Sequence, residues 1–178
     1  MDALIQTKTG ALSGRDSTAP DAPPMFDLIE LLFFAYRDFV GDADRLLESF
    51  GFGRAHHRVL HFVNRQSGLS IAELLDILRI TKQSLARVLK DLLEAGYVEQ
   101  RPGAVDRRQR QLFATAKGRR LALDLARLQS ARFARALAIL GPEARTGAID
   151  FLMAMIDPDE REKVGRQILT DTRNGTRP

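Results

Sequence analysis

The sequence contains no cysteine among its 178 residues. This absence excludes disulfide bonds, thiolate zinc sites, cysteine nucleophiles and thiol redox switches. No apolar run approaches the roughly 18 residues that a membrane-spanning helix needs. The first 24 residues have neither the basic start nor the apolar stretch of a signal peptide. We therefore expect a soluble, cytoplasmic protein.

The sequence also lacks the motifs of the common enzyme classes. It has no nucleophile–base motif and no phosphate-binding loop. His56, His57 and His61 lie together, and His57 and His61 could share a metal ion across one helical turn. No acidic residue or cysteine stands beside them in sequence, and the neighbouring arginines repel a cation. We therefore interpret this segment as a basic helix that faces solvent or DNA. A pH sensor is possible, but nothing in the sequence supports it. We predict no enzyme activity, no metal and no cofactor.

The charge of the chain is small overall and uneven in its distribution. The net charge is +4. Residues 25–50 carry six acids and two bases, whereas residues 70–120 carry eleven bases and six acids. Within the latter, residues 101–120 hold seven bases against Asp106 alone. Positive charge this concentrated indicates an anionic partner.

Apolar spacing and breaker residues predict a mainly helical chain with one small β-hairpin. In the first helix, Leu28, Leu32, Ala35, Phe39, Ala43 and Leu46 follow the spacing of a buried stripe. Leu31, Phe34 and Leu47 add apolar surface on a second side, which favours a subunit interface. The expected helices are 26–47, 54–65, 71–78, 82–95, 116–140, one after Gly141-Pro142 up to 156, and a short polar one at 159–169; the expected strands are 97–101 and 109–114.

Two capped helices joined by a short turn precede the hairpin. Ser70 and Glu73 have the spacing of a capping box, in which each side chain binds the backbone N–H of the other. Thr81 is a suitable N-cap for the next helix, and Gly96 a suitable stop. Two helices with a tight turn followed by a basic hairpin predict a winged helix-turn-helix.

The second helix of this pair has a face suited to the major groove of DNA. If Leu85, Leu89 and Leu92 face the core, polar side chains point outward. Gln can pair with adenine, and Arg or Lys with guanine. The predicted contacts of this helix with bases and phosphates come from Thr81, Lys82, Gln83, Ser84, Arg87 and Lys90.

The hairpin adds basic side chains beyond that helix. Arg107 and Arg108 stand at its tip, where a guanidinium can enter the minor groove. Asp106 is anionic, so we expect it to brace a neighbouring arginine rather than contact DNA. Arg101 and Arg110, on the two strands, are expected to contact flanking phosphates. By itself, an arginine-rich loop is usually a solvated basic surface. Because this loop directly follows a capped helix-turn-helix, DNA binding is the favoured interpretation.

These motifs resemble the MarR family of bacterial winged-helix regulators. The resemblance lies in Ser70-Ile71-Ala72-Glu73-Leu74-Leu75, in Thr81 through Leu89, in Leu92 through Val98, in Asp106-Arg107-Arg108 and in Thr115-Ala116-Lys117-Gly118, and it covers about 26–156. It implies an obligate homodimer built by the first helix and the last two long helices, with Arg108 as the minor-groove arginine. The turn at Arg79-Ile80 departs from the pattern, because it lacks the small residue often found there.

The resemblance also suggests an effector site. MarR-like proteins often bind small aromatic acids between the dimer helices and the DNA-binding lobe. Eight of the twelve Phe and Tyr residues fall between positions 26 and 62. Ordinary core and dimer packing is the simpler explanation for them. The alternative is a ligand cleft for an aromatic or anionic effector, lined by Tyr36, Phe39, Arg54, Arg58 and Phe62. Without cysteine, the thiol-based oxidant sensing of this family is excluded.

Together these patterns predict a mainly α protein (α+β) with a winged helix-turn-helix and a helical dimerisation region. The predicted parts are a disordered tail (1–24), dimerisation helices (25–69 and 116–157), a winged-helix lobe (70–115) and a polar C-terminal extension (158–178). The predicted function is a homodimeric transcriptional regulator, expected to repress, with helix 81–95 in the major groove and the wing 101–110 in the minor groove. The alternative is a winged-helix protein-interaction module that does not read DNA.

Overall fold

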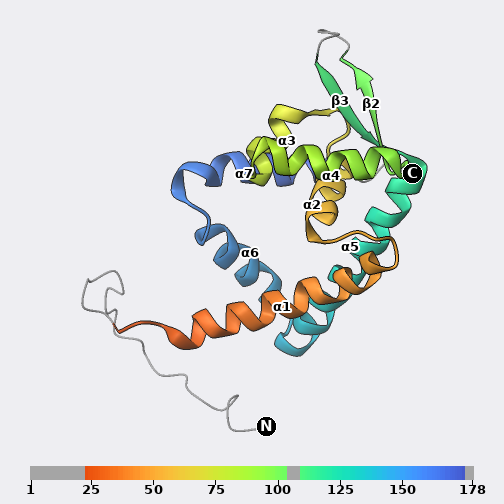
Figure 1. Cartoon of the computed structure of the whole chain (residues 1–178). Helices are drawn as coiled ribbons and strands as arrows, with labels where there is room; N and C mark the ends of the chain where they lie inside the picture. The colour runs from red at the N-terminus through yellow and green to blue at the C-terminus, as the bar shows by residue number, and fades with distance from the viewer. Residues whose placement is uncertain (1–22, 104–108, 175–178) are drawn as a thin grey trace. The chain divides into compact units, whose positions relative to one another are not determined.

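The computed structural model describes residues 23–103 and 109–174 (Figure 1). The chain divides into two compact units, residues 1–35 and 36–178, so that the boundary falls within the first helix. The helices are α1 (Phe26–Glu48), α2 (Arg54–Arg65), α3 (Ile71–Leu78), α4 (Lys82–Glu94), α5 (Ala116–Leu140), α6 (Ala144–Ala154) and α7 (Pro158–Asn174). The strands are β1 (Leu69–Ser70), β2 (Val98–Pro102) and β3 (Arg110–Ala114).

The mainly helical fold with a β-hairpin is confirmed, with three differences in detail. The two-residue strand β1 was not predicted, because so short a segment shows no alternation. Helix α6 begins at Ala144, so Pro142 precedes the helix instead of lying in its first turn. The polar C-terminal helix α7 is longer than the predicted segment 159–169.

The three strands form one antiparallel sheet in the order β1-β3-β2. Val98 pairs with Ala114 at the base of the hairpin, and Pro102 pairs with Arg110 near its tip. The Gly103 N–H donates to the Gln109 carbonyl (2.8 Å) and continues this pairing toward the wing loop. The hairpin therefore projects from the helices as a two-stranded wing (Figure 1).

Side-chain caps fix the helix starts where the sequence predicted them. The Ser70 hydroxyl accepts from the Glu73 N–H (3.2 Å), and the Glu73 carboxylate accepts from the Ser70 N–H (2.8 Å). Thr81 accepts from the Ser84 N–H, and Thr115 accepts from the Gly118 N–H. These bonds satisfy backbone donors that a helix start leaves without partners.

The core of the second unit lies where the helices meet the sheet. It contains the C-terminal part of α1, one face each of α2, α3 and α4, the sheet, and the start of α5. Its fully buried large side chains are Leu47, Val59, Leu60, Val63, Leu74, Leu85, Leu92, Leu112 and Leu125. Each such side chain contributes roughly 1.5–3 kcal/mol by leaving water.

The start of α5 lies directly against the chain at Tyr97. A Cβ atom on Gly118 would lie 2.0 Å from the Tyr97 carbonyl oxygen. The Thr115 N–H donates to the same carbonyl (3.0 Å). Because backbone atoms cannot move aside easily, this contact requires glycine at position 118 and locks α5 to the winged-helix lobe.

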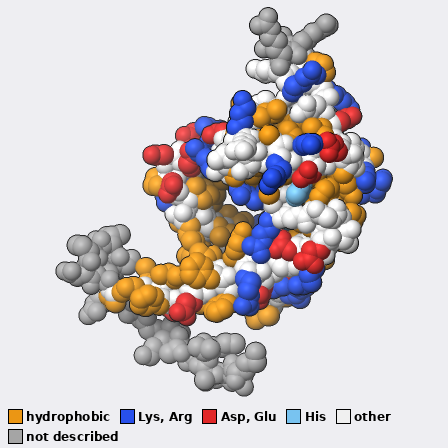
Figure 2. All heavy atoms as spheres, in the orientation of Figure 1, with side chains coloured by type: hydrophobic (Ala, Val, Ile, Leu, Met, Phe, Trp, Pro, Cys, Tyr) orange, Lys and Arg blue, Asp and Glu red, His pale blue; other side chains and the backbone are white. Residues whose placement is uncertain are grey.

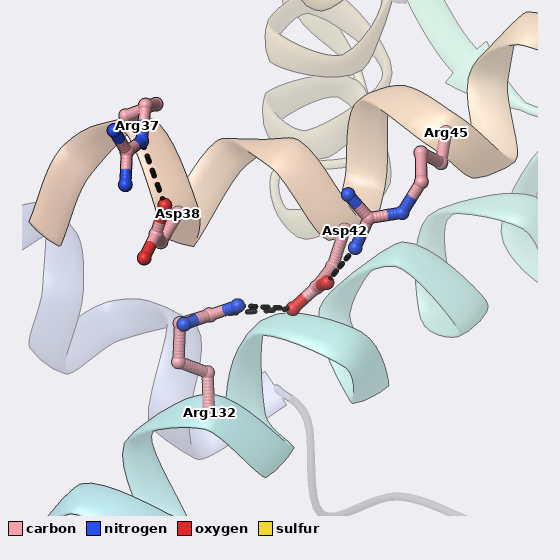
Figure 3. A network of polar contacts seen from close by, with 5 residues as sticks. All are labelled: Arg37, Asp38, Asp42, Arg45 and Arg132. Atoms are coloured by element: carbon pink, nitrogen blue, oxygen red, sulfur yellow. Dashed lines mark hydrogen bonds and ion pairs between the residues drawn. The ribbon is translucent and has the colours of Figure 1, made fainter. Parts of the chain in front are cut away.

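A polar network connects the second-unit part of α1 to α5 (Figure 3). Arg132 on α5 donates from Nε (3.2 Å) and Nη2 (2.9 Å) to Oδ2 of Asp42 on α1. Arg45 donates to the other oxygen of Asp42, and Arg37 pairs with Asp38 (2.9 Å). The hydrogen bond from Arg132 lowers the pKa of Asp42, so this carboxyl group stays ionised. An acidic residue of α1 therefore contributes to the packing of α1 against α5.

Within this single chain, the first part of the predicted stripe of α1 is exposed, and its last part is buried. In the first unit, Leu28 and Leu32 are 48% and 45% exposed. Ala35 is exposed as well. In the second unit, Val40, Ala43 and Leu47 are the buried residues. Leu47, which we placed on the second side, is thus part of the core, and hydrophobic side chains remain gathered on the surface of the first part of α1 (Figure 2).

Candidate nucleic-acid interface and adjoining cleft

Helix α4 has one buried face and one polar face. Leu85, Val88, Leu89 and Leu92 are buried. This matches the predicted inner face and adds Val88 to it. The predicted outward positions Lys82, Gln83, Ala86, Arg87 and Lys90 are all exposed. The helix is therefore anchored by packing while its polar side chains are available to a ligand.

The N-terminus of α4 carries two hydroxyl groups that bind each other. Thr81 Oγ1 donates to Ser84 Oγ (2.9 Å) while accepting from the Ser84 N–H (3.1 Å). Both residues are exposed. The helix start combines exposed hydroxyls with the positive end of the helix dipole, an arrangement that favours an anion.

The described part of the wing places two of its predicted arginines on the strands. Arg101 on β2 pairs with Glu99 and lies over the Phe113 ring, 4.6 Å from its centroid. Arg110 on β3 is exposed. The predicted brace Asp106 and the tip residues Arg107 and Arg108 lie outside the described residues.

The turn between α3 and α4 has an unusual backbone. Arg79 adopts φ 51° and ψ 45°, in the left-handed region. That conformation favours glycine, which explains the small residue often found here in the family that the sequence resembles. Arg79 is held by Glu160 of α7 (2.7 Å), and this hydrogen bond raises the pKa of its guanidinium. A long-range ion pair thus accompanies the strained turn.

A histidine and a lysine form hydrogen bonds at the C-terminal end of α4. The Gly53 N–H donates to His56 Nδ1 (3.1 Å), and His56 Nε2 lies 3.1 Å from Oδ2 of Asp91 on α4. With Nδ1 accepting, Nε2 carries the proton and donates to Asp91. Lys117 donates to the Ala95 carbonyl (2.9 Å), which follows α4. These contacts fix the orientation of α4 relative to α2 and α5.

The five predicted cleft residues meet around one cavity. Tyr36, Phe39, Arg54, Arg58 and Phe62 all line a cavity of about 310 Å³. The sequence did not predict its remaining lining, which is Val40, His57, His61 and Gln129. The size falls at the lower end of the range for small-molecule sites, roughly 300–1,000 Å³. Aromatic walls with cationic groups can bind an aromatic anion.

The two arginines of the cleft differ in what they contact. Arg54 Nε donates to Asp44 Oδ2 (2.6 Å), which raises the pKa of the arginine. Arg58 Nη2 donates to the carbonyl of Leu78 (2.9 Å), the last residue of α3. The cleft is thereby connected to the turn that precedes α4. Burial and then the neighbouring His61 lower the pKa of His57, so this imidazole is neutral at pH 7.

The histidine cluster is not the solvated or DNA-facing helix that we expected. His57 and His61 line the cleft, and the side chain of His56 is only 16% exposed in its contact with Asp91. The prediction failed because the partners of these histidines come from other elements, distant in sequence. In the described ranges, no group of three or more His, Cys, Asp or Glu residues could hold a metal ion. None of the helices in those ranges is long and apolar enough to cross a membrane.

Comparisons with known proteins agree with this geometry. Residues 50–109 match the model of the MarR family. The HTH-type transcriptional regulator PetP of Rhodobacter capsulatus is 47% identical over 133 residues, which are 75% of this chain and 80% of the relative. The crystal structure of the transcriptional regulator SlyA has a TM-score of 0.62 at 18% identity, covering 79% of this chain and 95% of that one.

A further solved structure has the same fold. CouR from Rhodococcus jostii RHA1, solved bound to p-coumaroyl-CoA, has a TM-score of 0.61 at 22% identity and covers 74% of this chain and 93% of that one. The two structural likenesses establish a shared winged-helix fold. The identity to PetP over most of both chains establishes the family.

Proposed function

Because the chain belongs to the MarR family of winged helix-turn-helix transcriptional regulators, we propose that it regulates transcription as a homodimer bound to double-stranded DNA. The observation that carries the proposal is the division of α4 into a buried apolar face and an exposed polar one. Such a helix can enter the major groove without losing its own packing. The protein would act in the cytoplasm, where a chromosomal operator is accessible.

The proposed contacts follow from the exposed side chains. Lys82, Gln83, Arg87 and Lys90 would contact base edges or phosphates, with Thr81 and Ser84 at the helix start. Arg101 and Arg110 would contact flanking phosphates. Arg108 would enter the minor groove with Arg107 beside it and Asp106 as the brace. The wing and α4 would thus bind adjacent grooves of one half-site.

Exposed apolar side chains on three helices support dimerisation. They lie on the first part of α1, near the end of α5, and along α6 and its C-cap, and include Phe26, Leu31, Phe34, Phe133, Ile139, Leu140, Ile149, Phe151, Leu152 and Met155. Apolar side chains in such numbers favour burial against another chain. In this scheme 25–69 and 116–157 form the dimerisation region, 70–115 the winged-helix lobe and 158–178 an extension.

A two-fold dimer would bind a near-palindromic operator. Its half-sites would lie about 10 bp apart, one helical turn of DNA, or a multiple of that spacing. We propose repression as the sign of regulation, with release by an effector in the cleft. The cleft supports an aromatic or anionic effector, because Tyr36, Phe39 and Phe62 provide ring surfaces and Arg54 and Arg58 provide positive charge.

Duplex binding at several salt concentrations tests this function. The probe is an inverted repeat from the DNA flanking the gene, compared with a scrambled duplex of equal length. We expect log K to fall linearly with log salt, by about 0.9 for each phosphate neutralised. Arg108→Ala should weaken binding substantially without altering the mass of the dimer, whereas Arg127→Ala on α5, where Arg127 pairs with Asp124, should not.

Two outcomes would contradict the proposal. If no duplex binds at low salt, the fold serves a protein-interaction module instead. If Arg108→Ala binds as tightly as the wild type, the assignment of the wing is wrong. Sedimentation of the unliganded protein provides the separate test of the dimer.

A further inference from the structure

Four charged side chains form a closed group between α3 and α7. Asp76 and Arg79 lie one helical turn apart at the end of α3, and Glu160 and Lys163 lie one turn apart on α7. Arg79 Nη2 lies 2.7 Å from Glu160 Oε1, and Lys163 pairs with Asp76. Contacts of 3.7 Å (Arg79–Asp76) and 4.0 Å (Lys163–Glu160) complete the group. We call these four residues the charge quartet.

The charges of the quartet are complementary between α3 and α7. Along α3 the order is negative then positive, and along α7 it is also negative then positive, so that each charge meets its opposite across the interface. Residues 76 and 163 are 87 positions apart, and residues 79 and 160 are 81 apart. The pairing therefore fixes one register of α7 against the helix-turn-helix.

Packing contributes little to this contact. Among the described side chains of α7, residues 158–168, none is buried. Beneath the quartet is a cavity of about 1,120 Å³, with Phe62, Ile77, Val164 and Ile168 among its lining residues. Ile168 remains 54% exposed. Exposed ion pairs are individually weak, so the four charges of the quartet hold α7 on α3 with little free energy.

The docked helix changes the electrostatics of the turn before α4. Arg79 stands two residues before Thr81, the N-cap of α4. Glu160 neutralises it, and Asp157 and Asp159 line the same cavity. A phosphate approaching the start of α4 therefore meets acidic side chains of α7, whereas without α7 it would meet the Arg79 guanidinium with Asp76 as its remaining partner in the quartet.

We propose that α7 is an internal competitor of the DNA backbone, which withholds Arg79 from phosphate while the charge quartet is closed. Release of α7 adds one basic contact per subunit at the start of α4. This inference rests on the proposed DNA-binding function, and it gives the C-terminal extension a role that the winged-helix lobe does not have by itself.

Matched neutralisations on α7 test the proposal in the full-length protein. Glu160→Gln opens the quartet, whereas Glu162→Gln removes the same charge from the same helix but affects only the pair of Glu162 with Arg166. The probe is a mixed-sequence 30-bp duplex, because phosphate contacts do not depend on sequence. Near 0.1 M salt, Glu160→Gln should bind about fivefold more tightly than Glu162→Gln, with a salt slope steeper by about 0.9 per added contact.

Arg79→Gln identifies the group that is released. In the Glu160→Gln background it should abolish the gain, and in the wild type it should change affinity little. Equal affinities of Glu160→Gln and Glu162→Gln would overturn the proposal, as would a gain that survives Arg79→Gln.

Hydrogen exchange provides a readout that needs no DNA. Amides of residues 160–168 should exchange faster in Glu160→Gln and Lys163→Gln than in Glu162→Gln. Equal exchange in all three would overturn the docking itself. Faster exchange without any gain in DNA affinity would overturn the competition with phosphate. If neither the wild type nor any variant binds the duplex, the proposed function itself is contradicted. The exchange result would still decide whether the quartet holds α7.

Discussion

The winged-helix lobe and helix α7 lie in the same unit but are held by different forces. Leu74, Leu85 and Leu112 in the lobe are fully buried, and the start of α5 meets the lobe in a backbone contact at Gly118. The described part of α7 has no buried side chain and meets α3 through the four charged side chains of the quartet. Burial makes the first region a fixed support for α4, whereas the charge pairing makes the second removable under mild conditions.

The largest effect is expected at the backbone contact of the lobe. Gly118→Ala should lower the free energy of unfolding by about 3 kcal/mol, because its Cβ has no space beside the Tyr97 carbonyl. Gly147→Ala on α6 is the matched control, since nothing lies within 4 Å of its Cβ position. It should stabilise the protein by roughly 0.5–1 kcal/mol through helix propensity. Urea unfolding measures both, and equal midpoints would contradict the contact.

A second pair of variants compares packing in the two regions directly. Leu112→Ala should cost about 2–5 kcal/mol, because it leaves a cavity in the core. Ile168→Ala on α7 should stay within about 0.5 kcal/mol, as is usual for surface positions. A large loss of stability in Ile168→Ala would show that α7 is packed and not merely paired by charge.

His57 lines the cleft, and its effect on stability should lie between the effect of the core and that of the charge quartet. Burial lowers the pKa of His57 from its usual 6.5, so the unfolded chain takes up the proton more readily than the folded one. This contribution to stability is therefore present above pH 6.5 and is lost as the pH falls through the lower folded-state value. Unfolding midpoints between pH 7.5 and 5.5 should fall more steeply for the wild type than for His57→Gln. Parallel pH profiles would mean that this imidazole is solvated.

The smallest effect on global stability is expected for the charge quartet. Raising the salt concentration from 0.05 to 0.5 M should speed amide exchange in α7, because exposed charges are screened. Exchange at the buried residues of α2 and α4 should be unchanged over the same range. If α7 exchanges at the same rate at both concentrations, charge does not hold it.

The lobe is also the region that the sequence predicts well. Helices α2 and α5 have the predicted limits, and the Ser70–Glu73 capping box and the caps at Thr81 and Thr115 are present. These features depend on residues within a few positions of each other. Local spacing and capping chemistry therefore contain the information needed to place them.

The features that the sequence does not predict depend on distant partners. His56 meets Asp91 across 35 positions, and Arg79 meets Glu160 across 81. The apolar side chains at Leu28 and Leu32 follow a helical stripe, yet the stripe alone does not say whether the covering surface belongs to the same chain. The left-handed conformation of Arg79 could be suspected from the missing small residue in the turn, but its ion pair could not.

We propose that the exposed face of α4 reads DNA. The most direct test compares the affinities of Gln83→Ala/Arg87→Ala and Arg127→Ala for the flanking inverted repeat and for its scrambled duplex. We predict that the α4 double variant loses about 1–3 kcal/mol of discrimination for each base contact removed, while Arg127→Ala keeps the wild-type ratio of the two affinities. An unchanged ratio in the α4 double variant, in a protein that still forms its dimer, would contradict the claim.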